Sequence, residues 1–219
     1  MPDQTSTTAP SPPGSTRWAG VPAAERRTER RRLLLDAALE LFGTEGDAAT
    51  SVRAVCKKAQ LNARYFYENF ADRDALLLAT RDHLATGALR AFEDAIEHTH
   101  PDKRIRAVVD AVIDFFTADP RRGRLMFESH PALLGRRREM LRMLSRIVAD
   151  QSTVLLGDRA AAAKDRELGA LTLVSGMLEV FSGWLRGEVD VTREHLADFL
   201  VAMVNTTGDL AAALARERR

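Results

Sequence analysis

The chain has 219 residues, of which 45% are hydrophobic and 29% are charged, and its formal net charge is +1. This composition is ordinary for a soluble protein, and the small net charge excludes a polycation that coats nucleic acid or anionic membrane along its whole length. The single cysteine, Cys56, excludes an intramolecular disulfide and fits a reducing compartment. The chain start lacks the charged and apolar runs of a signal peptide, so we expect a cytoplasmic protein.

The N-terminal part divides into a tail and a helix. Residues 1–24 are rich in Pro, Ser, Thr, Ala and Gly and predict a disordered tail. An arginine-rich run, residues 25–32, then enters a helix whose apolar stripe reaches Phe42, and Gly43 and Gly46 are expected to end it. The arginines are either a solvated helix end or contacts to a DNA backbone, and the segment that follows favours the second reading.

Residues 50–74 predict a helix, a tight turn and a second helix. We expect Thr50 to cap a helix over residues 51–59, and Asn62 to cap a helix over residues 63–70. Phe66 and Phe70 are four residues apart and can pack inward, which leaves Arg64 outside. Asp72 is expected to cap the next helix. The alternative is a purely structural hairpin with a basic surface; residues 26–73 hold ten Lys or Arg and seven Asp or Glu.

A second helix with an apolar back and an exposed first turn is what entry into the major groove requires. We expect Arg64 and Tyr65 to reach base edges. Phosphate contacts, which fix register without reading sequence, are expected from Thr50, Ser51, Arg53, Tyr67 and Arg73.

Several short motifs in fixed order make residues 26–78 resemble the TetR family of bacterial transcriptional regulators. They are Leu39-Glu40-Leu41-Phe42, Gly46, Ala49-Thr50-Ser51-Val52, Ala59, Leu61-Asn62, Phe66-Tyr67, Phe70 and Arg73-Asp74-Ala75-Leu76. The resemblance implies a DNA-binding set made of Thr50, Ser51, Arg53, Asn62, Ala63, Arg64, Tyr65, Tyr67 and Arg73. The family usually has glycine where Gln60 stands, so we expect some strain in that turn.

The rest of the chain predicts a helical body. Helices are expected over residues 74–98, 105–116, 121–127, 136–156, 165–185 and 192–214, which gives about nine in all. Residues 168–185 approach the length of a membrane span but include Glu179, so we expect a buried helix and no membrane partner. Gly169, Gly176 and Gly183 repeat every seven residues and permit close helix approach. The resemblance implies a homodimer through the last two long helices.

Large apolar side chains gather in the predicted body helices. Residues at such spacing are usually core, but as a group they permit a cavity, and the resemblance implies a hydrophobic small-molecule effector. The candidate effector residues are Phe116, Met126, Phe127, Met140, Met143, Met177, Phe181 and Trp184.

No catalytic pattern is found. The five histidines show no metal-ligand spacing, and there is no nucleophile elbow or phosphate-binding glycine loop. We therefore expect no metal, no cofactor and no enzymatic activity. The sequence favours an all-α homodimer with a helix-turn-helix domain over residues 26–72 and an effector-binding and dimerisation domain over residues 74–217. Such a protein would be a ligand-responsive repressor of a palindromic DNA operator. The alternative is a helical small-molecule carrier or interaction protein.

Overall fold

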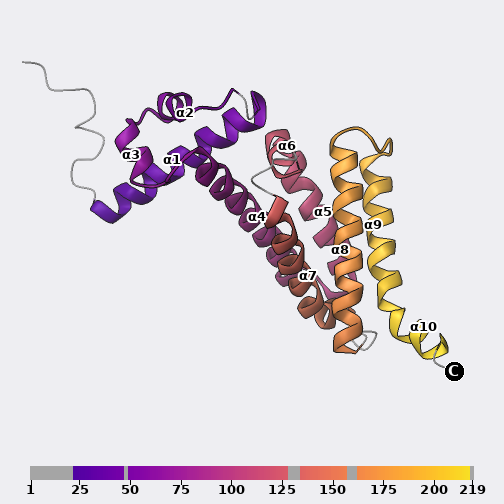
Figure 1. Ribbon diagram of the computed structural model, residues 1–219. Coiled ribbons are helices and arrows are strands. Elements are labelled where there is room, and N and C mark those ends of the chain that lie inside the picture. Colours follow the sequence, from indigo (N-terminus) through magenta and orange to yellow (C-terminus); the bar gives the residue numbers. More distant parts are fainter. Residues whose placement is uncertain (1–21, 47–48, 128–133, 157–161, 218–219) are drawn as a thin grey trace, which may run out of the picture.

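The computed structural model describes residues 22–46, 49–127, 134–156 and 162–217, and every regular element within these ranges is a helix (Figure 1). The all-α prediction is therefore confirmed. The expected tail lies almost entirely outside the described residues, but its last two residues are helical because the first helix begins at Ala23. The helices are α1 (Ala23–Thr44), α2 (Val52–Ala59), α3 (Ala63–Tyr67), α4 (Arg73–Glu97), η1 (Pro101–Lys103), α5 (Arg104–Thr117), α6 (Pro120–Phe127), α7 (Leu134–Leu156), α8 (Ala163–Leu185), α9 (Arg193–Gly208) and α10 (Leu210–Glu217).

Helices α1, α2 and α3 share one core at one end of the molecule (Figure 1). Leu34 and Phe42 of α1, Val55 of α2 and Phe66 of α3 are at most 2% exposed. Leu76, near the start of α4, is fully buried in the same core. Each such side chain contributes roughly 1.5–3 kcal/mol when it leaves water, so the short α2 and α3 are held mainly by packing on α1 and α4.

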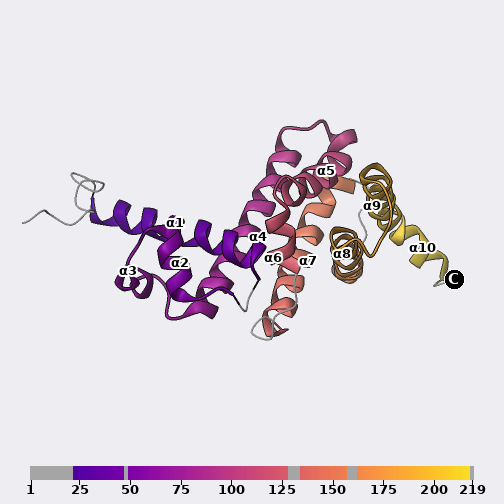
Figure 2. The ribbon, with the colours of Figure 1, turned by 90° about the horizontal axis from the view of Figure 1, so that it is seen from above.

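Helix α4 runs from this N-terminal domain into the body, where it packs against α5 (Figures 1 and 2). The approach is close, since a Cβ added at Gly87 would lie 2.7 Å from the ring of Phe115. Helix α6 also contacts α1, where the Arg124 guanidinium donates to the Gly43 carbonyl at 3.1 Å. A Cβ at Gly43 would lie 2.7 Å from the Cβ of Arg121. The end of α1 is thus fixed against the body.

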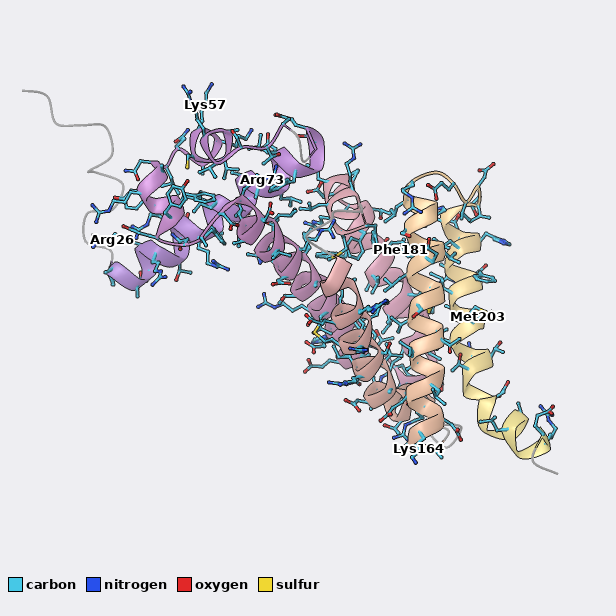
Figure 3. The ribbon with its side chains drawn as sticks, viewed as in Figure 1. Arg26, Lys57, Arg73, Lys164, Phe181 and Met203 are labelled. Carbon is cyan, nitrogen blue, oxygen red and sulfur yellow. The ribbon has the colours of Figure 1, made fainter. Side chains whose placement is uncertain are left out.

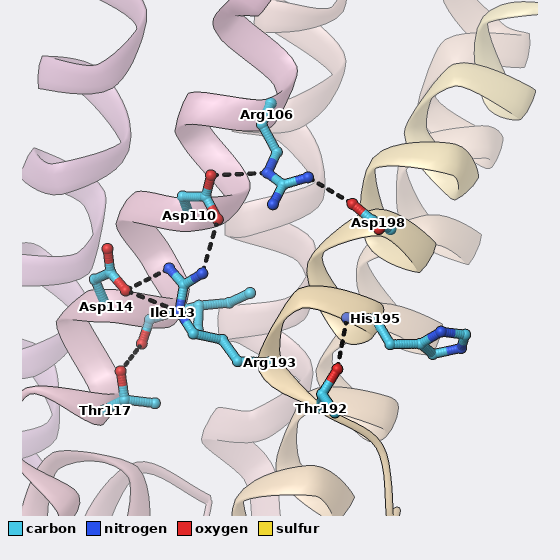
Figure 4. A network of polar contacts seen from close by, with 9 residues as sticks. All are labelled: Arg106, Asp110, Ile113, Asp114, Thr117, Thr192, Arg193, His195 and Asp198. Atoms are coloured by element: carbon cyan, nitrogen blue, oxygen red, sulfur yellow. Dashed lines mark hydrogen bonds and ion pairs between the residues drawn. The ribbon is translucent and has the colours of Figure 1, made fainter.

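Ion pairs join α5 to α9 in the body (Figure 4). Arg193 bridges Asp114 at 2.5 Å and Asp110 at 3.2 Å. Arg106 bridges Asp110 at 2.8 Å and Asp198 at 2.5 Å. These side chains are largely in contact with solvent, so each pair contributes little by itself, but together they fix the rotation of α9 on α5.

Two helix predictions were wrong at their ends. The second helix of the hairpin stops at Tyr67, not at residue 70, because the chain tightens there: the Asn69 amide side chain donates to the Tyr65 carbonyl at 2.8 Å. Such side-chain bonds compete with the helix. The helix expected over residues 192–214 is divided at Asp209 into α9 and α10. Gly208 precedes this break, and glycine in a helix interior is destabilising.

Candidate nucleic-acid interface

Helix α2 presents two free cations above a buried back. Val55, Cys56 and Ala59 face the core, whereas Arg53 and Lys57 are exposed. Lys57 points away from the molecule in Figure 3, and neither cation makes an ion pair within the described part of the chain. A pair of unneutralised cations on an outer face is suited to phosphate contact.

The start of α2 corrects the expected cap. The Ser51 hydroxyl, not Thr50, accepts a bond from the Ala54 amide at 3.2 Å. Thr50 is only 2% exposed, and its hydroxyl donates to the Gly46 carbonyl at 2.8 Å. A side chain that is buried and already bonded is poorly placed for the phosphate contact that we expected of Thr50.

The turn after α2 has the strained conformation that the missing glycine suggested. Gln60 has φ 55° and ψ 39°, and it is the one non-glycine residue with positive φ in the described ranges. Its backbone N–H donates to the Lys57 carbonyl at 3.3 Å, and the Leu61 backbone N–H donates to the Cys56 carbonyl at 2.9 Å. These two bonds form a Schellman motif, whose geometry needs a left-handed residue at this position. The motif directs the chain into α3.

Helix α3 exposes the residues expected to contact DNA. Asn62 caps it as predicted, accepting from the Tyr65 amide at 3.1 Å. The Arg64 side chain is 83% exposed, Tyr67 is exposed and Tyr65 is half-buried. The buried Phe66 anchors the helix and makes an edge contact with the Tyr67 ring and a tilted contact with the Phe70 ring. The structure thus brings Ala63, Arg64, Tyr65 and Tyr67 to one short surface helix.

Arginines of α1 hold α3 in place, which sequence reasoning missed. The Arg30 guanidinium lies 4.5 Å from the Tyr65 ring centroid, and that of Arg31 lies 4.6 Å from the Phe70 ring centroid. Arg27 donates to the Glu68 carbonyl at 3.2 Å. Their repeat along α1, three and four residues apart, was the available signal, but it did not show which surface the arginines cover.

Arg73 has an internal role as well as an exposed edge. Its guanidinium donates to the Thr50 carbonyl at 3.3 Å, pairs with Asp74 at 3.4 Å and lies over the Phe42 ring. Asp72 caps α4 as predicted, accepting from the Ala75 amide at 2.7 Å. Arg73 therefore ties the start of α4 to the start of α2 (Figure 3), and 28% of its side chain stays exposed.

The expected effector residues divide into a packed cluster and outliers. Phe116, Phe127 and Phe181 contact one another with ring centroids 5.3–5.8 Å apart, and Trp184 stacks on Phe181. Met126 is buried and Met140 packs against this core. Met143, by contrast, is 46% exposed and is not among the buried residues of this core. Met177 lines a separate groove of about 480 Å³ along α8 and α9.

Comparisons with known proteins bear on the N-terminal domain. Residues 34–80 match the family model described as "Bacterial regulatory proteins, tetR family". The chain is 32% identical over 107 residues to the HTH-type transcriptional activator FasR of Mycolicibacterium smegmatis. This match covers 47% of this chain and 48% of that protein. It is 33% identical over 104 residues to the HTH-type transcriptional repressor Rv3405c of Mycobacterium tuberculosis, covering 42% and 55%. The chain thus spans about half the length of these relatives.

The fold of the whole chain is also found among solved structures. A TetR-like transcriptional regulator from Rhodococcus sp. RHA1 superposes with a TM-score of 0.59 at 22% identity, over 80% of this chain and 93% of that one. At this identity the likeness concerns the fold alone. These similar proteins are named as transcriptional regulators. Residues 34–80 thus match the tetR family of bacterial regulatory proteins, and the chain as a whole has the fold of a TetR-like regulator.

Proposed function

We propose that the chain is a DNA-binding transcriptional regulator that reads a palindromic operator as a homodimer. The observation that carries this proposal is the exposed face of α2 and α3. Arg53, Lys57 and Arg64 stand out from two helices that are otherwise fixed by a buried core. A short helix with a rigid back and outward polar side chains can enter the major groove.

The partner surface of the proposed dimer is the outer face of α8 and α9, far from α3 (Figure 1). Leu168 is 66% exposed, Leu171 42%, Phe199 46% and Met203 40%. A Cβ added at Gly176 on this face would meet nothing within 4 Å, which leaves room for a second helix. Exposed apolar patches of this kind mark interaction surfaces. A two-fold dimer places its two recognition helices on successive turns of DNA.

A lipid membrane is a less suitable partner for this exposed apolar face than a second copy of the chain. Helix α8 contains an 18-residue window with a mean hydropathy of 1.4, so by length and composition alone it could cross a membrane. Its first turns, however, carry Lys164, Asp165, Arg166 and Glu167, and Glu179 follows further along. The helix also packs against α6, α7 and α9 along its other side. We therefore propose a second copy of the chain as the partner and no membrane.

We further propose regulation by a hydrophobic small molecule bound at the aromatic cluster of Phe116, Phe127, Phe181 and Trp184. The rings fill this region, so a ligand would have to displace at least one of them. Such a ligand changes DNA affinity only if it binds the two forms of the dimer with different affinity. We propose repression as the outcome, although the relatives include both an activator and a repressor.

Selection of genomic fragments by the purified protein tests the DNA-binding proposal. We expect enrichment of a palindrome whose affinity falls steeply with salt. Arg64→Ala and Tyr65→Ala should abolish the sequence preference and leave the dimer intact. Arg90→Ala, which removes an exposed cation from α4, should preserve the sequence preference. Full specificity in both α3 variants would reject α3 as the reading helix. Absence of salt-dependent DNA binding would favour the carrier alternative.

Sedimentation tests the dimer separately. Phe199→Glu should convert the protein to monomers, because it places a charge in the centre of the proposed interface. Val154→Glu is the matched control, since Val154 on α7 is equally exposed at 46%. A wild-type monomer at micromolar concentration, or equal effects of the two substitutions, would contradict the proposed interface. Extraction and mass spectrometry of co-purified small molecules tests the effector.

A further inference from the structure

Glu68, just after α3, collects arginines from two helices. One carboxylate oxygen accepts a bond from the Arg64 Nε at 3.0 Å, and the other lies 3.7 Å from an Arg30 terminal nitrogen. Its backbone carbonyl accepts from Arg27 at 3.2 Å. The Glu68 side chain is 36% exposed and that of Arg64 is 83% exposed. The carboxylate therefore lies beneath the outermost guanidinium of the recognition helix and is itself fixed from below.

The bond to Glu68 uses one particular donor of Arg64. A guanidinium has five N–H donors, one on Nε and two on each terminal nitrogen. Since Nε is bonded to Glu68, the two terminal nitrogens keep four donors, and none of these has a partner within the described chain. Two parallel donors match the O6 and N7 acceptors of guanine in the major groove.

We propose that Glu68 is a positioning residue for sequence reading: it orients Arg64 toward a guanine and weakens binding to DNA that lacks that guanine. This inference rests on the proposed DNA-binding function. A fixed Arg64 loses little side-chain freedom when it meets its base. A carboxylate next to DNA also repels phosphates and lowers affinity for every duplex. Together the two effects favour the cognate site, where the guanine contact offsets the repulsion.

Glu40 provides a matched control in the same domain. Its carboxylate pairs with Lys58, its side chain is 38% exposed, and it does not contact Arg64. Glu68→Gln and Glu40→Gln each remove one negative charge with almost no change of shape. A purely electrostatic effect on DNA affinity is therefore expected of both substitutions, whereas an effect on Arg64 is expected of Glu68→Gln alone.

The experiment measures the dissociation constants of wild type and both variants for the selected operator and for a scrambled duplex of equal length, at several salt concentrations. Thermal unfolding checks that each variant is folded. We expect Glu40→Gln to bind both duplexes more tightly and to keep their affinity ratio within about twofold. Glu68→Gln should tighten binding to the scrambled duplex and lower the ratio by about fivefold or more.

A double-mutant comparison and a modified base connect this loss to Arg64. In an Arg64→Ala background, Glu68→Gln should no longer change the ratio. The modified operator carries 7-deazaguanine in place of the guanine for which Arg64→Ala loses its preference. Wild type should bind this operator less tightly than the unmodified one, and the loss of affinity should be smaller for Glu68→Gln. Equal ratios for Glu68→Gln and Glu40→Gln, or an unchanged effect without Arg64, would overturn the positioning role. A wild type that does not distinguish operator from scrambled duplex would instead overturn the proposed function.

Discussion

Replacing Gln60 by glycine should stabilise the protein, because Gln60 is in the left-handed region with φ 55° and ψ 39°. A residue with a Cβ pays roughly 1–2 kcal/mol to adopt this conformation. Glycine avoids that cost but gives the unfolded chain more freedom, which offsets about 0.4–1 kcal/mol. Gln60 is exposed, so its side chain contributes little packing. The net expectation for Gln60→Gly is a gain of about 0.5–1 kcal/mol in the free energy of unfolding.

Lys57→Gly is the control for this substitution. Lys57 is exposed on the same short helix but has helical backbone angles. Glycine there increases unfolded-state freedom in the same way and relieves no strain, so we expect a loss of about 1 kcal/mol. The two substitutions thus have opposite predicted signs although the residue introduced is identical.

Urea unfolding followed by far-ultraviolet circular dichroism measures both free energies. For a chain of this length, 1 kcal/mol corresponds to a change of about 2–4 °C in the melting temperature, so a thermal scan is an independent check. If Gln60→Gly and Lys57→Gly destabilise the protein equally, the left-handed turn carries no strain and the reasoning is refuted.

Three further predictions concern single side chains elsewhere. Burial raises the pKa of the Cys56 thiol. A thiol reagent such as DTNB should therefore label the native protein slowly at pH 8 and the unfolded protein rapidly. Fast labelling of the native protein would contradict the buried position of Cys56. The Arg121 guanidinium holds the pKa of Asp119 below its ordinary value of 3.8, so the stability from this pair is present above that value and lost as pH falls through the lower folded pKa. Asp119→Asn should therefore destabilise the protein at pH 7 and lessen the dependence of unfolding on acid, as measured by urea titrations from pH 7 to 2. Arg193→Ala breaks the pair with Asp114 on α5 and should cost about 0.5–1 kcal/mol at low salt, with a smaller loss in 1 M NaCl; an equal loss at both salt concentrations would show that packing, not charge, is responsible.

Local patterns in the sequence were enough to predict the helical architecture and two of the helix starts in the candidate interface. Caps at Asn62 and Asp72 were predicted correctly, because one short side chain bonded to a nearby amide determines a helix start. Thr50 and Ser51 were harder to separate, since either hydroxyl can cap. The choice depends on which of them the rest of the domain buries, and the fold buries Thr50.

Contacts between helices could not be predicted from such local patterns. The repeat of arginines along α1 marked a charged face, but whether that face meets solvent, DNA or protein depends on where α3 lies after folding. In the fold, Arg30 and Arg31 lie over aromatic rings of the α3 region, and Arg30 also approaches Glu68. A guanidinium placed in this way stabilises the reading helix rather than neutralising phosphate. The cations most available to DNA are therefore Arg53, Lys57 and Arg64, so the electrostatic part of binding should depend on α2 and α3 more than on the denser charge of α1.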